Sequence, residues 1–499
     1  MIETESHDLV PEAARAAGGG KATRTAARLA NLGLAVLAFA LALVTRADAD
    51  LWGHLRFGLD ILDSRQLTEI DPYSFTQDVP WVNHEWLSEV QMAAAYRYGG
   101  LAGLLVLKAA IIWFVFALIW RSLARAAVRV RLTVSAMVIV GTLHMTAVAR
   151  PQLWTFLCSA ILCRLLPSPS WRDRWWLPLV FVFWVNSHGG WIVGLGVVGV
   201  WAAGHVWTHP SRFRSWAALV SACILATLVN PYGWGMWGFI GGTVRMERAI
   251  DEWQSLWTTP VLNWVPWALA VAGTVWMWVR HTPHRLPVAA VLVMLAFAAA
   301  RVLRIESLFV ATAAILLAPA LSVRWPRTQV PRMSRSAAFA ISGTFLALAF
   351  TSSVWLGGRA LSCVPITGPW APDLEAMASL RHAEPGRIVT PFNWGEYAIW
   401  HLGPRVRVSM DGRRETIYSD RMLAANDAVV AGTPEGLHTL AEWNPEYVWL
   451  PASSQSTSAW LVSRGYRLDI ETPSSTVLVR TDQPFLPPSL AAPAACFPG

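Results

Sequence analysis

The chain has 499 residues, of which 54% are hydrophobic and only 14% are charged. Soluble proteins have roughly 45–50% apolar and about 25% charged residues, so this composition excludes an ordinary soluble enzyme. The 30 tryptophans point the same way, because indole rings favour the bilayer interface. The formal charge of +8 would suit either nucleic acid or a membrane, and the positions of the basic residues decide between them. The five cysteines form no metal-ligand pattern.

A membrane-spanning helix needs roughly 17–25 apolar residues, or fewer where interfacial aromatic residues flank it. Eleven runs meet this criterion, at 29–45, 98–120, 132–148, 152–166, 174–186, 189–207, 215–230, 261–279, 286–300, 305–321 and 337–356. The segment Trp234–Ile240 is interpreted as a re-entrant or interfacial turn, so we expect ten to twelve spans. Residues 1–28 are polar and alanine-rich, and they predict a cytoplasmic tail rather than a signal peptide.

Basic residues indicate the orientation of the chain, because short cytoplasmic loops are enriched in lysine and arginine. Alternate connections contain arginines and a single acid, Asp173. These arginines are Arg121, Arg125, Arg129, Arg131, Arg172, Arg174, Arg212, Arg214, Arg280, Arg285, Arg324, Arg327, Arg332 and Arg335. We therefore expect these loops and the N-terminus on the cytoplasmic side of a bacterial cytoplasmic membrane. The basic excess is then a topology signal, and no nucleic-acid partner is needed to explain it.

Acidic residues gather in the first outer loop, residues 46–89, which has nine acids and three arginines. The loop begins with Asp48-Ala-Asp-Leu-Trp-Gly-His-Leu-Arg, and leucines at three- and four-residue spacing from Leu51 predict a helix along the membrane surface. Asp50 and His54 share a face of that helix. Asp50 is interpreted either as the N-cap of the helix or as a catalytic carboxylate at its start.

The second half of the loop offers further acids. Asp71 before a proline is typical of a turn. His84-Glu85-Trp86 puts a histidine and a carboxylate beside an interfacial aromatic residue, which favours a functional role. Glu89, one turn further, fits a solvated helix face equally well. The concentration of acids in one loop of a chain so poor in charge predicts the active site here.

Residues 358–499 have ordinary polarity and predict a small α/β domain on the outer side, after a membrane domain over 29–357. Alternating patterns predict strands at Arg387–Thr390, Val406–Met410, Tyr447–Leu450, Tyr466–Glu471 and Thr476–Thr481. Helical patterns lie between them, near 393–402, 419–431, 434–443 and 456–464. Cys363 and Cys496 flank the domain, and either a disulfide or two unpaired thiols fits the sequence. The fold class expected is thus an all-α polytopic membrane domain of about eleven helices followed by an α/β extracytoplasmic domain.

The first-loop motif Asp50-Leu-Trp-Gly-His-Leu-Arg resembles that of the membrane-embedded GT-C glycosyltransferases, in a form similar to oligosaccharyltransferase catalytic subunits. The overall layout is similar to protein mannosyltransferase-like and lipid A sugar-transferase-like members. Asn393-Trp-Gly-Glu-Tyr and Met410-Asp-Gly-Arg-Arg-Glu resemble segments of uncharacterised bacterial members. The chain lacks a clear acidic pair in a second outer loop and a Trp-Trp-Asp motif, so transfer to protein asparagine is not supported.

The resemblance implies transfer of a sugar from a polyprenyl-phosphate donor at the outer face. The first-loop carboxylate, acting as base or metal ligand, maps onto Asp50, with Asp48 as its competitor and Glu85 as a further catalytic acid. Positive charge for the leaving phosphate would come either from Arg150, Arg301 or Arg304, or from a divalent cation, Mg²⁺ or Mn²⁺, held by Asp50 and Glu85. The residues expected to bind substrate are His54, Arg56, His84, Arg150, His188, Arg301 and Arg304.

Structural roles compete with several of these assignments. An arginine at the outer end of a span can extend to lipid headgroups, and His188, in Asn186-Ser-His-Gly-Gly, can serve helix-end packing. Asp411-Gly-Arg-Arg fits a turn first and a sugar-binding edge second. At the level of function, the alternatives are a non-catalytic scaffold or receptor whose outer domain binds a partner, and a lipid-linked sugar transporter. Span interiors nearly free of charge disfavour the transporter.

Overall fold

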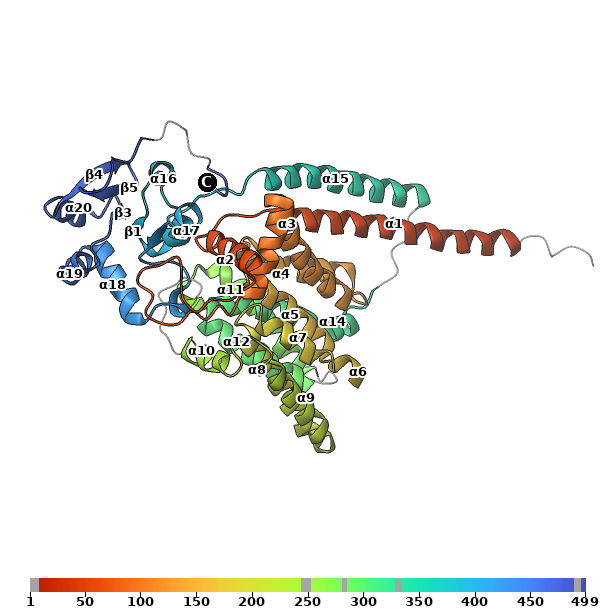
Figure 1. Cartoon of the computed structure of the whole chain (residues 1–499). Coiled ribbons are helices and arrows are strands. Elements are labelled where there is room, and N and C mark those ends of the chain that lie inside the picture. The colour runs from red at the N-terminus through yellow and green to blue at the C-terminus, as the bar shows by residue number, and fades with distance from the viewer. Residues whose placement is uncertain (1–8, 244–252, 281–284, 328–333, 489–494) are drawn as a thin grey trace, which may run out of the picture.

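The computed structural model describes residues 9–243, 253–280, 285–327, 334–488 and 495–499. A helical bundle makes up the part up to Ser362, and a smaller domain with one sheet follows it (Figure 1). The mostly helical architecture with a small sheet near the C-terminus is as the sequence predicts.

Every predicted span lies in a helical region, although the spans at 174–186 and 305–321 are each divided between two helices. The helices of the bundle are α1 (Leu9–Leu43), α2 (Leu51–Ser64), α3 (Trp86–Ser122), α4 (Val128–Thr146), α5 (Gln152–Leu165), α6 (Trp171–Arg174), α7 (Leu177–Val185), α8 (Trp191–Thr208), α9 (Phe213–Ala226), α10 (Gly235–Thr243), α11 (Trp264–Val279), α12 (Arg285–Arg301), α13 (Glu306–Leu316), α14 (Ala318–Arg324) and α15 (Arg335–Ser362). Within the described residues, six helices are long and apolar enough to cross a membrane, or seven if the bent pair of α13 and α14 counts as one span.

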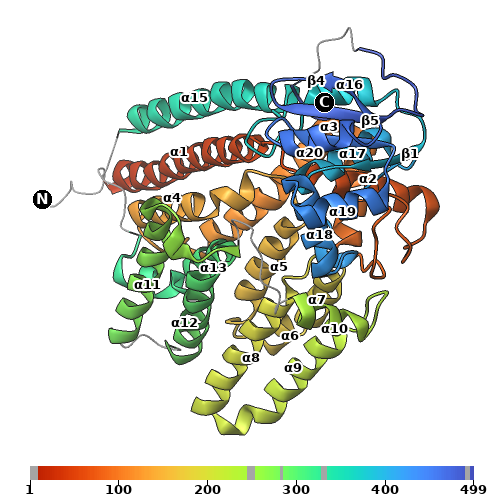
Figure 2. The same cartoon turned by 90° about the vertical axis from the view of Figure 1, so that its left-hand side faces the viewer.

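The first and last long helices, α1 and α15, pack along each other in both views (Figure 2). α1 starts at Leu9, well before the expected position 29, so the helix runs into the segment interpreted as a polar tail. Residues 1–8 of that segment lie outside the described residues. α10 covers the segment expected to form a turn at Trp234–Ile240.

The predicted surface helix is present as α2, which packs against α3 and against a helix of the C-terminal domain. Its buried face consists of Leu51, Trp52, Gly53, Leu55, Phe57 and Gly58. At Gly58, a Cβ would lie 2.2 Å from the backbone oxygen of Glu89, so only glycine lets α2 approach the start of α3 this closely. The apolar stripe that predicted a membrane-surface helix is therefore covered largely by protein.

The C-terminal domain holds a five-stranded sheet in the order β2-β1-β3-β5-β4. The strands are β1 (Gly386–Val389), β2 (Val406–Val408), β3 (Tyr447–Pro451), β4 (Tyr466–Glu471) and β5 (Ser475–Arg480). Each strand starts within two residues of its predicted first residue. β1 pairs in parallel with β2 and β3, whereas β5 pairs antiparallel with β3 and β4. The connecting helices are α17 (Gly395–Leu402), α18 (Asp420–Ala431), α19 (Pro434–Trp443) and α20 (Gln455–Val462), all predicted, and α16 (Leu374–Leu380), which was not.

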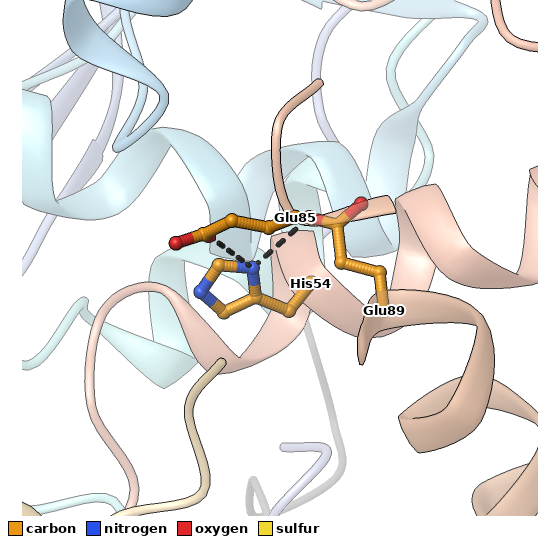
Figure 3. A group of neighbouring side chains, drawn as sticks. All are labelled: His54, Glu85 and Glu89. Atoms are coloured by element: carbon orange, nitrogen blue, oxygen red, sulfur yellow. Dashed lines mark hydrogen bonds and ion pairs between the residues drawn. The ribbon is translucent and has the colours of Figure 1, made fainter. Parts of the chain in front are cut away.

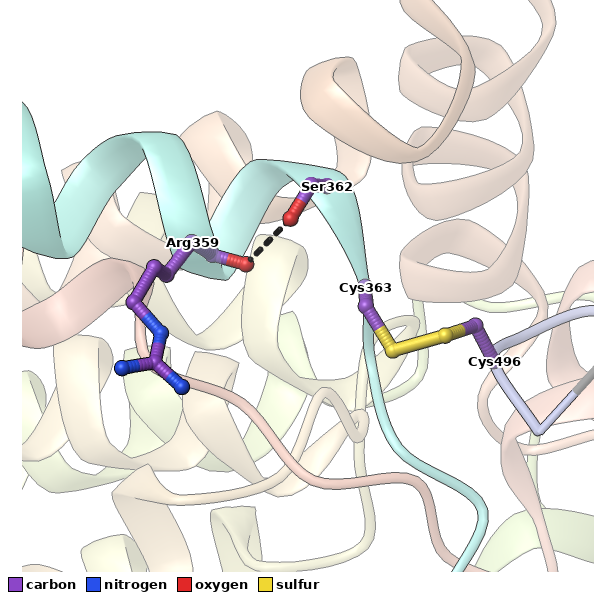
Figure 4. The surroundings of a disulfide bond; sticks show 4 residues. All are labelled: Arg359, Ser362, Cys363 and Cys496. Atoms are coloured by element: carbon purple, nitrogen blue, oxygen red, sulfur yellow. Dashed lines mark hydrogen bonds between the residues drawn. A yellow bond between two sulfur atoms is a disulfide. The ribbon is translucent and has the colours of Figure 1, made fainter.

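A disulfide joins Cys363, directly after α15, to Cys496 (Figure 4). Of the two alternatives that the sequence left open, the structure contains the bonded one. The segment after Cys496 then packs on α2, where the indole nitrogen of Trp52 donates to the backbone oxygen of Pro498 at 2.9 Å. The disulfide thus holds a stretch of chain that contacts the helix carrying Asp50 and His54.

Candidate active site

The first loop is fastened to the C-terminal domain by a buried arginine, Arg413. Its guanidinium donates to both carboxylate oxygens of Asp71, at 2.7 and 2.8 Å, and to both of Asp411, at 2.8 and 2.7 Å. The same guanidinium lies 4.7 Å from the ring centroids of Phe57 and Trp81. Asp71 also accepts backbone hydrogen bonds in the expected turn. The network therefore fixes α2 and the rest of the loop against the domain.

Asp50 occupies the N-cap position directly before α2, but its side chain makes no capping hydrogen bond. The carboxylate instead forms an ion pair with Arg150, 2.9 Å from the guanidinium, and Asp48 contacts the same arginine. The Asp50 side chain remains 25% exposed. The structure thus contradicts capping by the Asp50 side chain and places Asp48, Asp50 and Arg150 together.

A second cluster lies one turn along α2, where His54 meets Glu85 and Glu89 from the start of α3 (Figure 3). The Nδ1 atom of His54 is 3.1 Å from a Glu89 oxygen and 3.9 Å from a Glu85 oxygen. The amide of Asn83 donates to the other Glu89 oxygen at 2.6 Å. Glu89 is buried, so its interpretation as a solvated helix face is wrong, and it joins the site residues that the sequence did not select.

Two further predicted residues surround Glu85. The Nε2 atoms of His84 and His188 lie 3.4 and 3.5 Å from a Glu85 oxygen. Arg304 approaches the Nε2 atom of His188 at 3.1 Å and donates to the side-chain oxygen of Gln152 at 2.7 Å. The segment before α3 and the connection before α8 thus meet at the Glu85 carboxylate, and Arg304, just before α13, joins them through His188.

The charges of this cluster compensate one another. Burial alone would lower the pKa of His54, but the hydrogen bond with Glu89 and the charge of Glu85 outweigh it and raise that pKa. Burial would raise the pKa of Glu85, yet neighbouring His84 holds it far below its ordinary value. Burial lowers the pKa of His188 to about 3, so this imidazole is neutral at pH 7. Glu85 is therefore an ionised carboxylate in a largely buried site.

The C-terminal domain adds a carboxyl group, Glu396, that the sequence did not select. Glu396 accepts a hydrogen bond from the backbone nitrogen of Gly53 at 3.1 Å, and a Cβ at Gly53 would lie 2.2 Å from it. A Cβ placed on Gly412 would lie 2.6 Å from an Asp50 oxygen and 2.6 Å from a Glu396 oxygen. Because both oxygens are this close to one point, they can be no further apart than twice 2.6 Å. Burial and the charges of Asp50 and Asp411 raise the pKa of Glu396 well above its ordinary value.

The sequence did contain a signal for Glu396, because it lies within the Asn393-Trp-Gly-Glu-Tyr segment of the resemblance. Two of the residues predicted to bind substrate, Arg56 and Arg301, lie in surroundings other than those of the two clusters. Arg56 pairs with Asp60 on its own helix at 3.0 Å. Arg301 is exposed at the end of α12, and no contact ties it to the two clusters within the described part of the chain.

A metal ion has a donor set of suitable chemistry here. One ligand atom each from His54, Glu85 and Glu89 lie within 4.8 Å of one another. Asp50, which was expected to share an ion with Glu85, pairs with Arg150 and is not part of this group. One imidazole nitrogen and two carboxylates suit Mn²⁺ better than Mg²⁺, because Mg²⁺ favours oxygen ligands alone.

No protein-family model matches the sequence, and no curated protein matches it either. Solved structures do match. The apo oligosaccharyltransferase of Archaeoglobus fulgidus aligns over 87% of this chain and 72% of its own, with a TM-score of 0.57 and 11% identity. ArnT from Cupriavidus metallidurans bound to undecaprenyl phosphate aligns over 91% of this chain and 98% of its own, with a TM-score of 0.53 and 12% identity. At such identities the likeness demonstrates a shared fold.

Proposed function

Because the chain has the fold of the GT-C glycosyltransferases, as its first-loop motif predicted, we propose that it is a membrane glycosyltransferase acting on a polyprenyl-phosphate-linked sugar. The observation that carries this proposal is the convergence of Asp50, Arg150, His54 and Glu85 around α2. A solved neighbour with undecaprenyl phosphate bound supports the donor class. The sugar and the acceptor are not part of the proposal.

Asp50 acts as the general base. An acceptor hydroxyl attacks the anomeric carbon, the bond from that carbon to the phosphate oxygen breaks, and Asp50 takes the hydroxyl proton as the polyprenyl phosphate leaves. Arg150 holds the Asp50 carboxylate in place while part of it stays open to solvent. Asp48 is less suited as the base, because its side chain is 11% exposed against 25% for Asp50.

The departing phosphate needs positive charge more than it needs a proton. Arg304 and Arg150 are the half-buried cations around the two clusters, and charge-assisted hydrogen bonds from guanidinium groups suit phosphate oxygens. We also propose a divalent cation, Mn²⁺ ahead of Mg²⁺, on His54, Glu85 and Glu89. When bound, it would add positive charge for the phosphate.

The reaction takes place at the outer face of the bacterial cytoplasmic membrane, with the C-terminal domain extracytoplasmic. The arginine-rich connections support this orientation, because the first loop lies on the other side from them. The disulfide between Cys363 and Cys496 supports it as well, since disulfides persist in oxidising compartments. Cysteine-accessibility labelling of Arg359→Cys in intact cells tests it: reaction with an impermeant reagent is expected, and protection would contradict it.

Turnover of a donor separates this function from its alternatives. The full chain in detergent is incubated with polyprenyl-phosphate-linked hexoses and pentoses, with and without Mn²⁺, and released polyprenyl phosphate is measured by mass spectrometry. The transferase releases it in a reaction that Asp50→Asn slows by about 10²- to 10⁴-fold. A scaffold or receptor neither binds nor cleaves the donor, and a transporter binds it without cleavage, so either of these results overturns the proposal.

A further inference from the structure

The C-terminal domain contains a hollow of about 470 Å³ at the carboxyl ends of its parallel strands. Residues directly after β1, among them Phe392 and Asn393, form one wall, and residues after β3, among them Ser453, form another. Asp427 of α18 closes a third side. The volume is within the range of small-molecule sites, roughly 300–1,000 Å³.

The position of the hollow follows from the strand order. β1 lies between β2 and β3, so the chain leaves β1 toward one side of the sheet and later enters β3 on the other. Where connections diverge in this way, a crevice opens at the carboxyl ends of parallel strands, and sheets of this kind bind ligands there. The hollow is lined by residues that follow the two strands flanking this point.

The polar lining is available to a ligand. The side chains of Asn393, Asp427, Ser453 and Ser456 are exposed, and they make no hydrogen bond with any other residue that the structure describes. Together they supply amide, carboxylate and hydroxyl groups, which both donate and accept. Phe392 adds an aromatic ring to the same lining.

These groups select a neutral, hydroxyl-rich ligand. Among the described residues that line the hollow, none is basic. The guanidinium of Arg414, outside the lining, lies 5.3 Å from the Phe392 ring centroid and its charge acts on Asp427, so the two charges offset each other and the hollow offers no net positive charge to phosphate. Carboxylate, amide and hydroxyl groups pair with sugar hydroxyls, while an aromatic ring packs on the apolar face of a sugar. We propose that this hollow is a carbohydrate-binding subsite that holds the acceptor, which is therefore a glycan.

The subsite is connected to the candidate active site through one short turn. Asn393 lines the hollow, and Glu396, three residues later, contacts Gly53 of α2. Their Cα atoms can be at most about 11 Å apart, because consecutive Cα atoms are 3.8 Å apart. A glycan of several units is therefore long enough to extend from the hollow toward Asp50. This inference rests on the proposed function, of which it names the acceptor class.

Glycan binding by the full chain tests the subsite. The protein in detergent is applied to an array of neutral oligosaccharides, and bound glycans are titrated with Asp427→Ala and Phe392→Ala. Binding weakened at least tenfold in both variants is expected, with no change in Asp420→Ala, an exposed acid on the same helix outside the lining. No bound glycan, equal binding by the variants, or displacement by inorganic phosphate would overturn the subsite. Thermal unfolding verifies that the variants are folded.

The catalytic proposal and the subsite proposal can each be refuted without refuting the other. Glycans that bind the hollow of a chain without donor turnover would refute the transferase and leave a sugar-binding site. Donor turnover with a glycan acceptor that Asp427→Ala and Phe392→Ala leave at the wild-type KM would refute the subsite alone.

Discussion

Arg413 and Arg150 both bind first-loop carboxylates, but they do so in opposite ways. Arg413 is 5% exposed, its partners Asp71 and Asp411 are 0% exposed, and each carboxylate is bound by two nitrogens of the guanidinium. Arg150 is 19% exposed and its partner Asp50 is 25% exposed. The first arrangement is closed to ligands, whereas the second leaves carboxylate surface open.

This difference distinguishes a structural acid from a catalytic acid, although the two look alike in the sequence. A carboxylate with every lone pair occupied inside protein cannot accept a proton from a substrate. Asp71 is such a group, since it also accepts from the backbone nitrogens of Tyr73 and Ser74. Asp50 begins a helix, makes no capping bond and faces solvent in part. We therefore assign anchoring to Asp71 and proton transfer to Asp50.

The largest effect on stability is expected for Arg413→Met. Removing this arginine leaves two buried carboxylates without their partner, which costs about 3–5 kcal/mol of unfolding free energy. Unfolding in detergent, followed by tryptophan fluorescence, measures the loss. Arg407→Met, on the exposed side of β2, is the matched control and should change nothing. An equally stable Arg413→Met protein would contradict the anchoring role.

Arg150→Met should act mainly on turnover. Hydrogen bonds to charged groups contribute about 1.5–3 kcal/mol, so loss of the contact with Asp50 predicts a decrease in sugar transfer of roughly 10- to 100-fold. Arg150→Lys should recover part of that loss, because it restores the charge. If Arg150→Met lowered the unfolding free energy as much as Arg413→Met and kept full turnover per folded molecule, the two arginines would have the same role.

Chelation tests the second cluster. Removal of divalent ions should lower transfer, and Mn²⁺ should restore it more effectively than Mg²⁺, because His54 supplies a nitrogen ligand. Glu89→Gln should raise the Mn²⁺ concentration needed for half-restoration, by on the order of tenfold. Glu69→Gln, an exposed acid of the same loop, is the control. If chelation left the rate of sugar transfer unchanged, the proposed metal site would be wrong.

The smallest effect is expected for Glu396→Gln. With its pKa raised by burial and by Asp50 and Asp411, Glu396 is favoured as the neutral acid, which glutamine imitates while still accepting from Gly53. A carboxyl whose pKa is higher in the folded state stabilises the fold at low pH, and this contribution is lost as pH rises through the raised pKa. As pH rises, the unfolding free energy of the wild type should fall relative to that of Glu396→Gln. If the two unfolding free energies changed in parallel with pH, the raised pKa of Glu396 would be contradicted.

Local patterns were sufficient to predict much of this molecule. Short runs of strand-favouring residues located β3 and β4 at their first residues, Tyr447 and Tyr466, because such runs are a local signal along the chain. β3 is buried at four successive residues and does not alternate. Leucine spacing located α2 in the same way. α16 was missed, since its seven residues give too short a periodic signal.

Contacts between distant segments were beyond such patterns. Glu396 meets Gly53 across 343 positions, and Arg413 meets Asp71 across 342, so nothing in the local spacing indicated either. Arg301 and Arg304 looked equivalent in the sequence, but only Arg304 faces His188. The loop was identified by its charge, whereas the partners of each acid depended on tertiary packing.

The central claim is that Asp50 performs chemistry, and a paired measurement on Asp50→Asn and Asp71→Asn tests it most directly. Donor turnover per folded molecule and unfolding free energy are determined for both variants. Asp50→Asn should lose about 10²- to 10⁴-fold in turnover, the usual contribution of a general base, at wild-type stability. Asp71→Asn should lose stability while its folded fraction keeps turning over. Wild-type turnover by Asp50→Asn would contradict the claim.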